Sequence, residues 1–184
     1  LRSNTLQLQK LIEDLLDFNV ASSRASQLHV EHVALKPLIE LVLADHKVAA
    51  LARQLKLEID LQPVEIEGDR AKLQTLIDNL VSNAIKFSPE QGCLCVRLAQ
   101  RNEQAVIEVA DSGPGIPEEE RHRIFDAFYQ GTSPVNGHVR GTGLGLSIAR
   151  EYAQAHEGSI KVIDGDSPGA CLRVVLPIKT SGVN

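Results

Sequence analysis

The chain has 184 residues, with 19 Lys and Arg against 24 Asp and Glu, which gives a formal net charge of −5. Its length suits one domain with a short appendage, and 43% hydrophobic with 23% charged residues is a globular composition, which excludes wholesale disorder. A mildly acidic chain without a Lys/Arg cluster is a poor candidate for binding nucleic acid, and no apolar run reaches the ~20 residues that span a bilayer.

Two features of the composition are unusual. The sequence contains no Met, not even at position 1, so we expect it to be a piece of a longer chain. Aromatic residues make up only 3%, so the core must consist of Leu, Ile, Val and Ala. The cysteines Cys93, Cys95 and Cys171 are too few for a disulfide framework. We interpret them as small buried apolar residues, with a metal or redox role as the less favoured alternative.

Residues 1 to about 26 are predicted to form one long helix. Mostly apolar residues recur there in alternating steps of three and four. They form a heptad seam, which Ile12 and Leu16 widen. The seam consists of Leu1, Asn4, Leu8, Leu11, Leu15, Phe18, Ser22 and Ala25. A helix with such a stripe is not stable alone in water, so it must pack on a partner helix or dock on the following domain.

The next segment alternates short strands with a helix. Residues 30–35 predict a short strand or extended link, and Pro37 then opens a helix that runs to about Ala52. Strict alternation of apolar and polar residues over 57–61 and 64–67 predicts two half-buried strands.

The second half of the chain predicts two hairpins around a helix. Their elements are strands 93–99 and 105–110, a helix over 144–156, and strands 159–164 and 170–176. This order predicts an α+β fold, an α/β sandwich with one mixed, mostly antiparallel sheet that helices cover on one face. The long N-terminal helix is added to that sandwich.

Glycines cluster between the two hairpins. Of 13 glycines, seven lie from Gly113 to Gly145. The run 111–115 directly follows a strand, and the run 141–146 directly precedes a helix, where free N–H groups and the positive dipole end suit a phosphate. Neither run fits the Walker or the dinucleotide-binding pattern, and taken singly each could be a flexible turn.

A polar stripe accompanies the apolar face of a central helix. This helix is predicted to extend from Asp69, which can cap it, to Phe87. Asn79, Asn83 and Lys86 fall at i, i+4 and i+7, so they lie on one side of the helix. Amide oxygens suit Mg²⁺ and an ammonium suits a phosphate, whereas the ordinary alternative is a solvated polar edge.

Four segments together give these patterns a context. QTLIDNLVSNAIKFS (74–88), DSGPG (111–115), RIFDAFY (123–129) and GTGLGLS (141–147) resemble the N, G1, F and G2 boxes of sensor histidine kinases. The order and spacing of the boxes agree, and the resemblance extends from residue 1 to about residue 178. One box would be weak, but four in order are specific.

The resemblance implies an ATP-binding kinase domain that transfers the γ-phosphate of Mg-ATP to a histidine outside this chain. A response-regulator aspartate would then receive the phosphate. Asn83, supported by Asn79, would hold Mg²⁺, and Lys86 would contact the phosphates. The other ATP-binding residues that the resemblance implies are Phe87, Asp111, Gly113, Gly115, Ile116, Phe128, Tyr129, Arg140, Gly141, Thr142, Gly143, Leu144, Gly145 and Leu146.

The resemblance also implies an ATP lid over about 117–140, anchored by Phe125 and Phe128. Gln130 stands where relatives commonly carry Arg, and Arg140 could supply that charge instead. In gyrase-type relatives a Glu that activates water occupies the position of Asn79. An amide cannot act as a general base, so we expect phosphate transfer rather than rapid hydrolysis.

The implied domain division is 1–27, the second helix of a dimerisation and phosphoacceptor hairpin; 28–178, the catalytic domain; and 179–184, a tail. The parent would be a homodimer through the N-terminal helix, cytoplasmic in this part and attached to the inner membrane through upstream segments. None of the six histidines has a phosphoacceptor context, so all are expected to be structural or exposed. The alternatives are a degenerate nucleotide-binding or dimerisation module without kinase activity, and a hydrolytic relative.

Overall fold

A computed structural model describes residues 2–22, 28–130, 143–166 and 168–179. Five α-helices, seven strands and two 3-10 turns are found in these ranges. In chain order they are α1 (Arg2–Ser22), β1 (Glu31–Ala34), α2 (Leu35–Asp45), α3 (Lys47–Ala52), β2 (Lys56–Leu61), β3 (Glu65–Gly68), α4 (Arg70–Phe87), β4 (Cys93–Arg101), β5 (Gln104–Asp111), η1 (Glu118–Glu120), η2 (Arg123–Phe125), α5 (Gly145–Ala155), β6 (Ser159–Ile163) and β7 (Cys171–Pro177).

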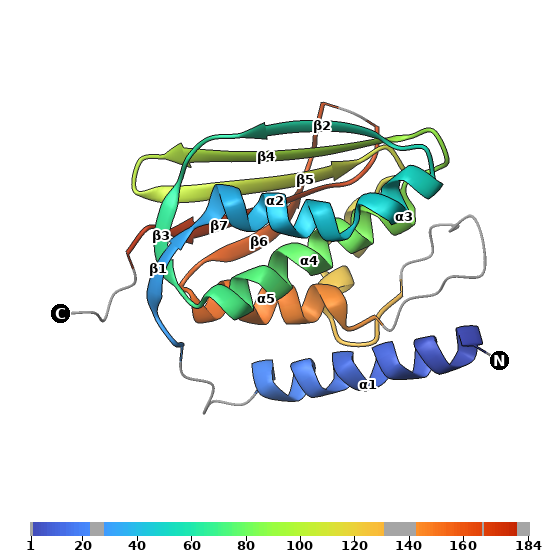
Figure 1. Ribbon diagram of the computed structural model, residues 1–184, viewed down its shortest axis with the longest axis horizontal. Helices are drawn as coiled ribbons and strands as arrows, with labels where there is room; N and C mark the ends of the chain where they lie inside the picture. Colours follow the sequence, from blue (N-terminus) through green and yellow to red (C-terminus); the bar gives the residue numbers. More distant parts are fainter. Residues whose placement is uncertain (1, 23–27, 131–142, 167, 180–184) are drawn as a thin grey trace.

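The main sheet has five strands in the order β2-β4-β5-β7-β6. β2 pairs with β4 in parallel, and the other neighbours are antiparallel. Helices α2, α4 and α5 lie on one face of this sheet (Figure 1). The α+β sandwich predicted from the sequence is therefore confirmed. A two-stranded antiparallel sheet of β1 and β3, which the sequence analysis did not separate, is added at one end.

Aliphatic side chains fill the space between the sheet and the helices. Leu94, Val96 and Leu98 alternate along β4 and are buried, and Leu76 and Leu80 of α4 are fully buried with them. The core thus draws on Leu, Ile, Val and Ala, as the scarcity of aromatic residues predicts.

Two local predictions were wrong. β2 is not half-buried, because Leu57 and Ile59 are 41% and 43% exposed. β2 is an edge strand, and its place at the edge depends on the pairing of the whole sheet rather than on its own alternation. The helix predicted from Pro37 to Ala52 is two helices, because the backbone leaves the helical region at His46 (φ −96°, ψ 4°).

His156 joins the start of α4 to the end of α5. Asp69 caps α4 by accepting a hydrogen bond from the Lys72 N–H at 3.2 Å, and its own N–H donates to His156 Nε2 at 3.0 Å. His156 Nδ1 lies 2.7 Å from the Tyr152 carbonyl oxygen, to which it donates. The imidazole is buried and neutral, and burial lowers its pKa. The two helices are thus held side by side.

The long N-terminal helix α1 packs along α5 (Figure 1). Leu15 and Phe18 contact the core from this helix and are half-buried, whereas Leu8, Ile12 and Leu16 remain exposed. The heptad seam is therefore divided between a docked side and an open side. Among the described residues, none of the helices is both long and apolar enough to cross a membrane.

The three cysteines are free thiols on the sheet. Cys171 is buried, and burial raises the pKa of its thiol to about 11. Cys93 and Cys95 are half-buried, so the prediction of buried cysteines is confirmed for Cys171 and only in part for the other two.

Candidate active site

Asn79 lies on the polar stripe of α4 and is only 7% exposed. Its Nδ2 is buried and has no hydrogen-bond partner among the described residues. Asn83 and Lys86, one and two turns further along, are partly exposed. Because buried polar atoms in folded proteins nearly always have a partner, Asn79 Nδ2 is a candidate donor to a bound group.

The N-terminus of α5 faces this amide. A Cβ built on Gly145 would lie 3.6 Å from both Cγ and Oδ1 of Asn79, so the first residue of α5 is in contact distance of the stripe. The N-cap residue of α5, Leu144, forms no cap hydrogen bond with its side chain. The positive end of the helix dipole therefore meets the Asn79 amide, an arrangement that suits an anion.

Lys86 places a cation near the C-terminal end of the stripe. Its Nζ lies 5.2 Å from the centre of the Phe87 ring, within the range of a cation–π contact. Burial lowers the pKa of its ammonium group. A partly desolvated ammonium is a stronger partner for an incoming anion than a fully hydrated one.

The Asp111 carboxyl lies at the end of β5 and is 5% exposed. Its Oδ1 accepts hydrogen bonds from the N–H groups of Gly113 at 2.9 Å and Ala170 at 3.2 Å. Burial raises the pKa of this carboxyl, and the two N–H groups act in the opposite direction. Asp111 is therefore held in one orientation by the backbone around it.

The loop after β5 packs against the end of α4. A Cβ on Gly113 would collide with the Phe87 carbonyl oxygen, and a Cβ on Gly169 would collide with the Asp111 carbonyl oxygen. The Ser112 Oγ also accepts from the Cys93 N–H at 2.7 Å. The absence of side chains at Gly113 and Gly169 thus lets three segments that are distant in sequence meet around Asp111.

A hollow of about 440 Å³ opens beside this loop. Gly115 and Ile116 line it together with residues of the β6–β7 hairpin, and Arg121 pairs with Asp164 at 2.7 Å on its wall. Gly115 has φ +77°, which its lack of a side chain permits. The lining does not include Asn79 or Asp111, so this hollow is separate from the polar stripe.

The two phenylalanines of the F segment have different surroundings. Phe125 is buried, as expected of an anchor, whereas Phe128 is 57% exposed and has φ +63°. Its N–H donates to the Gly143 carbonyl at 2.9 Å, and its ring lies 6.3 Å from that of Phe18 in an edge-on arrangement. Phe128 is therefore supported by α1 rather than by the core. Tyr129 next to it lies under the Arg123 guanidinium, 4.7 Å away.

Three predicted site residues, Arg140, Gly141 and Thr142, lie outside the described residues. Gly143, Leu144, Gly145 and Leu146 are described, and Leu144 is fully buried at the start of α5.

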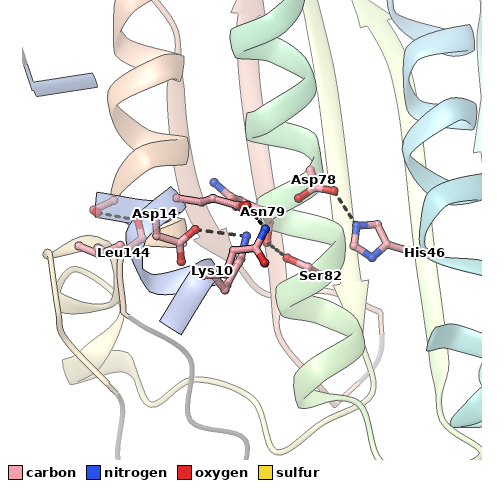
Figure 2. Close-up of polar contacts among 10 residues, drawn as sticks. Lys10, Asp14, His46, Asp78, Asn79, Ser82 and Leu144 are labelled. Atoms are coloured by element: carbon pink, nitrogen blue, oxygen red, sulfur yellow. Dashed lines mark hydrogen bonds and ion pairs between the residues drawn. The ribbon is translucent and has the colours of Figure 1, made fainter. Parts of the chain in front are cut away.

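Asp14 of α1 is a buried acidic residue near the polar stripe that was not predicted from the sequence. Its carboxylate pairs with Lys10 Nζ at 3.2 Å, and Figure 2 shows this pair at the level of Asn79 and Leu144. Asp14 stands three residues after Leu11 and four before Phe18, on the docked side of the helix. An acidic residue inside an apolar stripe was the signal that could have revealed it.

The donor set fits a divalent cation that arrives with most of its own oxygen ligands. In the described ranges no group of three or more His, Cys, Asp and Glu side chains could hold a metal ion. Asn79 and Asn83 offer neutral amide oxygens, and the idle Nδ2 of Asn79 suits a phosphate oxygen. Mg²⁺ typically keeps phosphate and water ligands and takes only one or two from the protein.

The chain is similar to several known proteins. Residues 68–180 match the family described as histidine kinase-, DNA gyrase B-, and HSP90-like ATPase. The sensor histidine kinase GlrK of Escherichia coli (strain K12) is 37% identical over 177 residues, which cover 96% of this chain and 37% of GlrK. The chain thus spans little more than a third of that relative.

Two solved structures are also similar. The mycobacterial sensor histidine kinase MprB has a TM-score of 0.70 at 30% identity, covering 83% of this chain and 99% of that one. Full-length ShkA in complex with AMPPNP has a TM-score of 0.81 at 27% identity, covering 96% of this chain and 37% of that one.

Proposed function

The chain belongs to the histidine kinase-, DNA gyrase B- and HSP90-like ATPase family, and from this membership we propose that it is the ATP-binding kinase domain of a sensor histidine kinase. The observation that carries the proposal is the buried Asn79 amide, whose Nδ2 has no hydrogen-bond partner among the described residues and which faces the start of α5. A triphosphate would satisfy both groups at once. That one of the similar structures is a complex with AMPPNP supports the same ligand class.

The described residues of the predicted site have surroundings that are compatible with the roles proposed for them. Asp111, held by two backbone N–H groups, would accept a hydrogen bond from the adenine amino group. Phe87, Gly113, Gly115 and Ile116 would enclose the base. The phosphates would lie on the N–H groups of Gly143, Leu144 and Gly145 at the start of α5, with Leu146, Tyr129 and Phe128 around them. The proposed ATP-binding residues also include Arg140, Gly141 and Thr142, which lie outside the described residues.

The phosphate end would hold Mg²⁺ through Asn83 and Asn79. Bound there with ATP, the ion would neutralise phosphate charge. Lys86 would bind a phosphate oxygen with its partly desolvated ammonium group. These side chains orient the nucleotide, and positioning with charge stabilisation is most of what phosphoryl transfer requires.

The site is suited to transfer rather than hydrolysis. Asn79 occupies the place of a water-activating carboxylate and cannot accept the proton. The acceptor would be a histidine outside this chain, as the resemblance implies. Of the histidines here, His156 uses both ring nitrogens internally, His32 pairs with Glu65 and His46 pairs with Asp78. A response-regulator aspartate would receive the phosphate next.

The remaining predictions complete this proposal. Residues 1–27 would be the second helix of a dimerisation hairpin, 28–178 the catalytic domain and 179–184 a tail. The exposed Leu8, Ile12 and Leu16 would pack in a homodimer of the parent protein. That protein would reach the inner membrane through segments outside this chain, with this part in the cytoplasm. A degenerate module without kinase activity is the alternative.

Titration calorimetry with Mg-ATP tests the proposal. We expect wild type to bind and Asn83→Ala to lose most of the heat, while Gln100→Ala, which removes an exposed amide, binds like wild type. Mg-ATP binding by Asn83→Ala at wild-type affinity would contradict the assignment of the site. Steady-state ATP hydrolysis by wild type at rates typical of gyrase-type enzymes would instead favour the hydrolytic relative.

A further inference from the structure

The main sheet ends at β2, and no strand among the described residues lies on the other side of β2 (Figure 1). β2 has six residues, contains no Pro, and keeps continuous register with β4 without a bulge. Proteins commonly blunt an edge strand with Pro, a bulge or a covering segment, because its outward N–H and C=O groups can pair with another strand. This edge is therefore a candidate interaction surface.

The outward backbone groups of β2 belong to its apolar residues. The Lys56 N–H donates to the Gly92 carbonyl oxygen, on the β4 side, at 2.9 Å. Because the backbone groups of successive strand residues alternate in direction, those of Leu57 and Ile59 point away from β4. A strand added at this edge would therefore form its hydrogen bonds with these two residues.

The two faces of β2 carry different side chains. Leu57 and Ile59 stand opposite the buried Leu94 and Val96 of β4, so they continue the helix-covered face of the sheet. They are nevertheless 41% and 43% exposed, because the core layer stops at this edge. The other face of β2 carries the exposed charged residues Lys56, Glu58 and Asp60.

We propose that β2 pairs antiparallel with β2 of a second copy of this chain, about a two-fold axis at Glu58. Leu57 of each copy then stands opposite Ile59 of the other, and the four apolar side chains cover one another. Lys56 of each copy stands opposite Asp60 of the other, and such cross-strand pairs of opposite charge stabilise a sheet. This surface is separate from the proposed ATP site and from the exposed side of α1.

The charges of a single copy allow this rearrangement. Lys56 Nζ lies 3.0 Å from Glu58 Oε1 in the same strand, but the two side chains are 76% and 50% exposed. An ion pair in water contributes little, so Lys56 can turn to Asp60 of the second copy at small cost. The two Glu58 side chains meet on the axis and are the one unfavourable pair.

Neighbouring registers fit less well. An axis one residue further along would place Glu58 opposite Asp60 of the second copy at two positions, and like charges directly opposite are destabilising. An axis one residue earlier would bring Leu55 into the hydrogen-bonded pairing. The Leu55 N–H already donates to the Ala50 carbonyl oxygen at 3.0 Å, so it is not available to a second copy.

The first experiment traps the pairing covalently, because one pair of short strands is a small interface and its association is transient. Cys93→Ser and Cys95→Ser first remove the thiols that stand opposite Lys56 and Glu58 on β4. Glu58→Cys in this background should give a covalent dimer on mild oxidation, seen on a non-reducing gel. Opposite residues of a non-hydrogen-bonded pair have Cα atoms about 4.5 Å apart, within the range of a disulfide.

The register is tested in the same background. Asp60→Cys alone should stay monomeric, because its thiol would face Lys56 of the second copy. A mixture of Asp60→Cys with Lys56→Cys should form the covalent dimer. Failure of Glu58→Cys to cross-link, or equally rapid cross-linking by Asp60→Cys alone, overturns the inference.

The second experiment reverses the charges and measures the dimer dissociation constant by sedimentation equilibrium. All proteins carry Ile12→Glu, which charges the exposed side of α1 and so removes association through that helix. Lys56→Glu turns two attractive pairs into repulsive ones and should weaken the dimer about 10-fold. Combining it with Asp60→Lys restores both pairs with reversed sign and should return the dissociation constant to within about 3-fold.

Two further variants complete this experiment. Glu58→Gln removes the repulsion on the axis and should tighten the dimer about 3-fold. Lys161→Glu changes an exposed lysine on β6, at the opposite edge of the sheet, and should have no effect. A double charge reversal that stays as weak as Lys56→Glu alone overturns the inference. A protein that remains monomeric at about 1 mM does so as well.

Discussion

At the base end of the proposed site the Asp111 carboxyl accepts two backbone N–H groups, whereas at the phosphate end the Asn79 Nδ2 has no partner among the described residues. The base end is also closely packed, because Gly113 and Gly169 lie against backbone atoms. At the phosphate end Gly145 has ordinary contact distances to Asn79, although a Cβ on Gly143 would lie 2.8 Å from the Phe128 backbone. The proposed base end is thus held by the backbone around Asp111, whereas the proposed phosphate end has a buried donor that a ligand would satisfy.

The largest expected effect is at the base end. Asp111→Ala removes both the proposed acceptor for the base and the anchor of the surrounding loop. We expect Mg-ATP binding to weaken at least about 100-fold, roughly 2.7 kcal/mol, in titration calorimetry. Asp60→Ala, which removes an exposed carboxylate on β2, is the matched control and should bind normally. An Asp111→Ala variant with intact affinity would mean that the base lies elsewhere.

A pair of glycine substitutions tests the difference in packing. Gly113→Ala forces a Cβ into the Phe87 carbonyl, so we expect it to lower the free energy of unfolding by about 2–3 kcal/mol in a denaturant titration. Gly145→Ala meets no atom closer than 3.6 Å and lies in a helix, so stability should be unchanged or slightly higher. An equal loss of unfolding free energy in both variants would show that the two ends of the site are equally closely packed.

Asn79→Ala should separate stability from binding. Removing a buried amide with an idle donor is expected to raise the free energy of unfolding of the nucleotide-free protein by about 1 kcal/mol. The same change should weaken Mg-ATP binding about 10-fold, roughly 1.4 kcal/mol. Gln74→Ala on the same helix is the control, because it measures the gain in the free energy of unfolding that comes from helix propensity alone. If Asn79→Ala lost stability, the amide would have a partner in solution.

The smallest expected effect concerns His156, which links the start of α4 to the end of α5. Burial lowers the pKa of His156, so the unfolded chain binds its proton at higher pH than the folded protein. Stability should therefore be complete above the ordinary histidine pKa of 6.5 and decline as the pH falls below it. Denaturant titrations at pH 7.5 and 5.5 measure the loss. His156→Gln should reduce this dependence, and exposed His122→Gln should leave it unchanged.

Local features were predictable from the sequence and long-range ones were not. The cap at Asp69, the extent of α4 and both hairpins follow from periodicity and turn residues, and the structure confirms them. The resemblance to sensor histidine kinases assigned the four boxes to one nucleotide-binding site. The exposure of β2 and the break at His46 depend on how the whole sheet assembles, which no local window contains.

Within the site, contacts between segments that are distant in sequence could not be predicted. Asn79 and Lys86 could be placed on one helix side from their spacing alone. The approach of Gly145 to Asn79, and of Phe18 to Phe128, joins parts of the chain that lie far apart in sequence. The packing of α1 along α5 likewise brings together two helices that are far apart in sequence (Figure 1).

The antiparallel pairing of β5 with β7 has a consequence for folding kinetics. These neighbours are separated in sequence by residues 112–170, which include the F and G2 segments and α5. Such a long closure is entropically costly, so the hairpin β4–β5 with α4 can form before β7 joins the sheet. The phosphate end would then be among the last parts to assemble. Bound nucleotide should accordingly slow unfolding while leaving the folding rate almost unchanged.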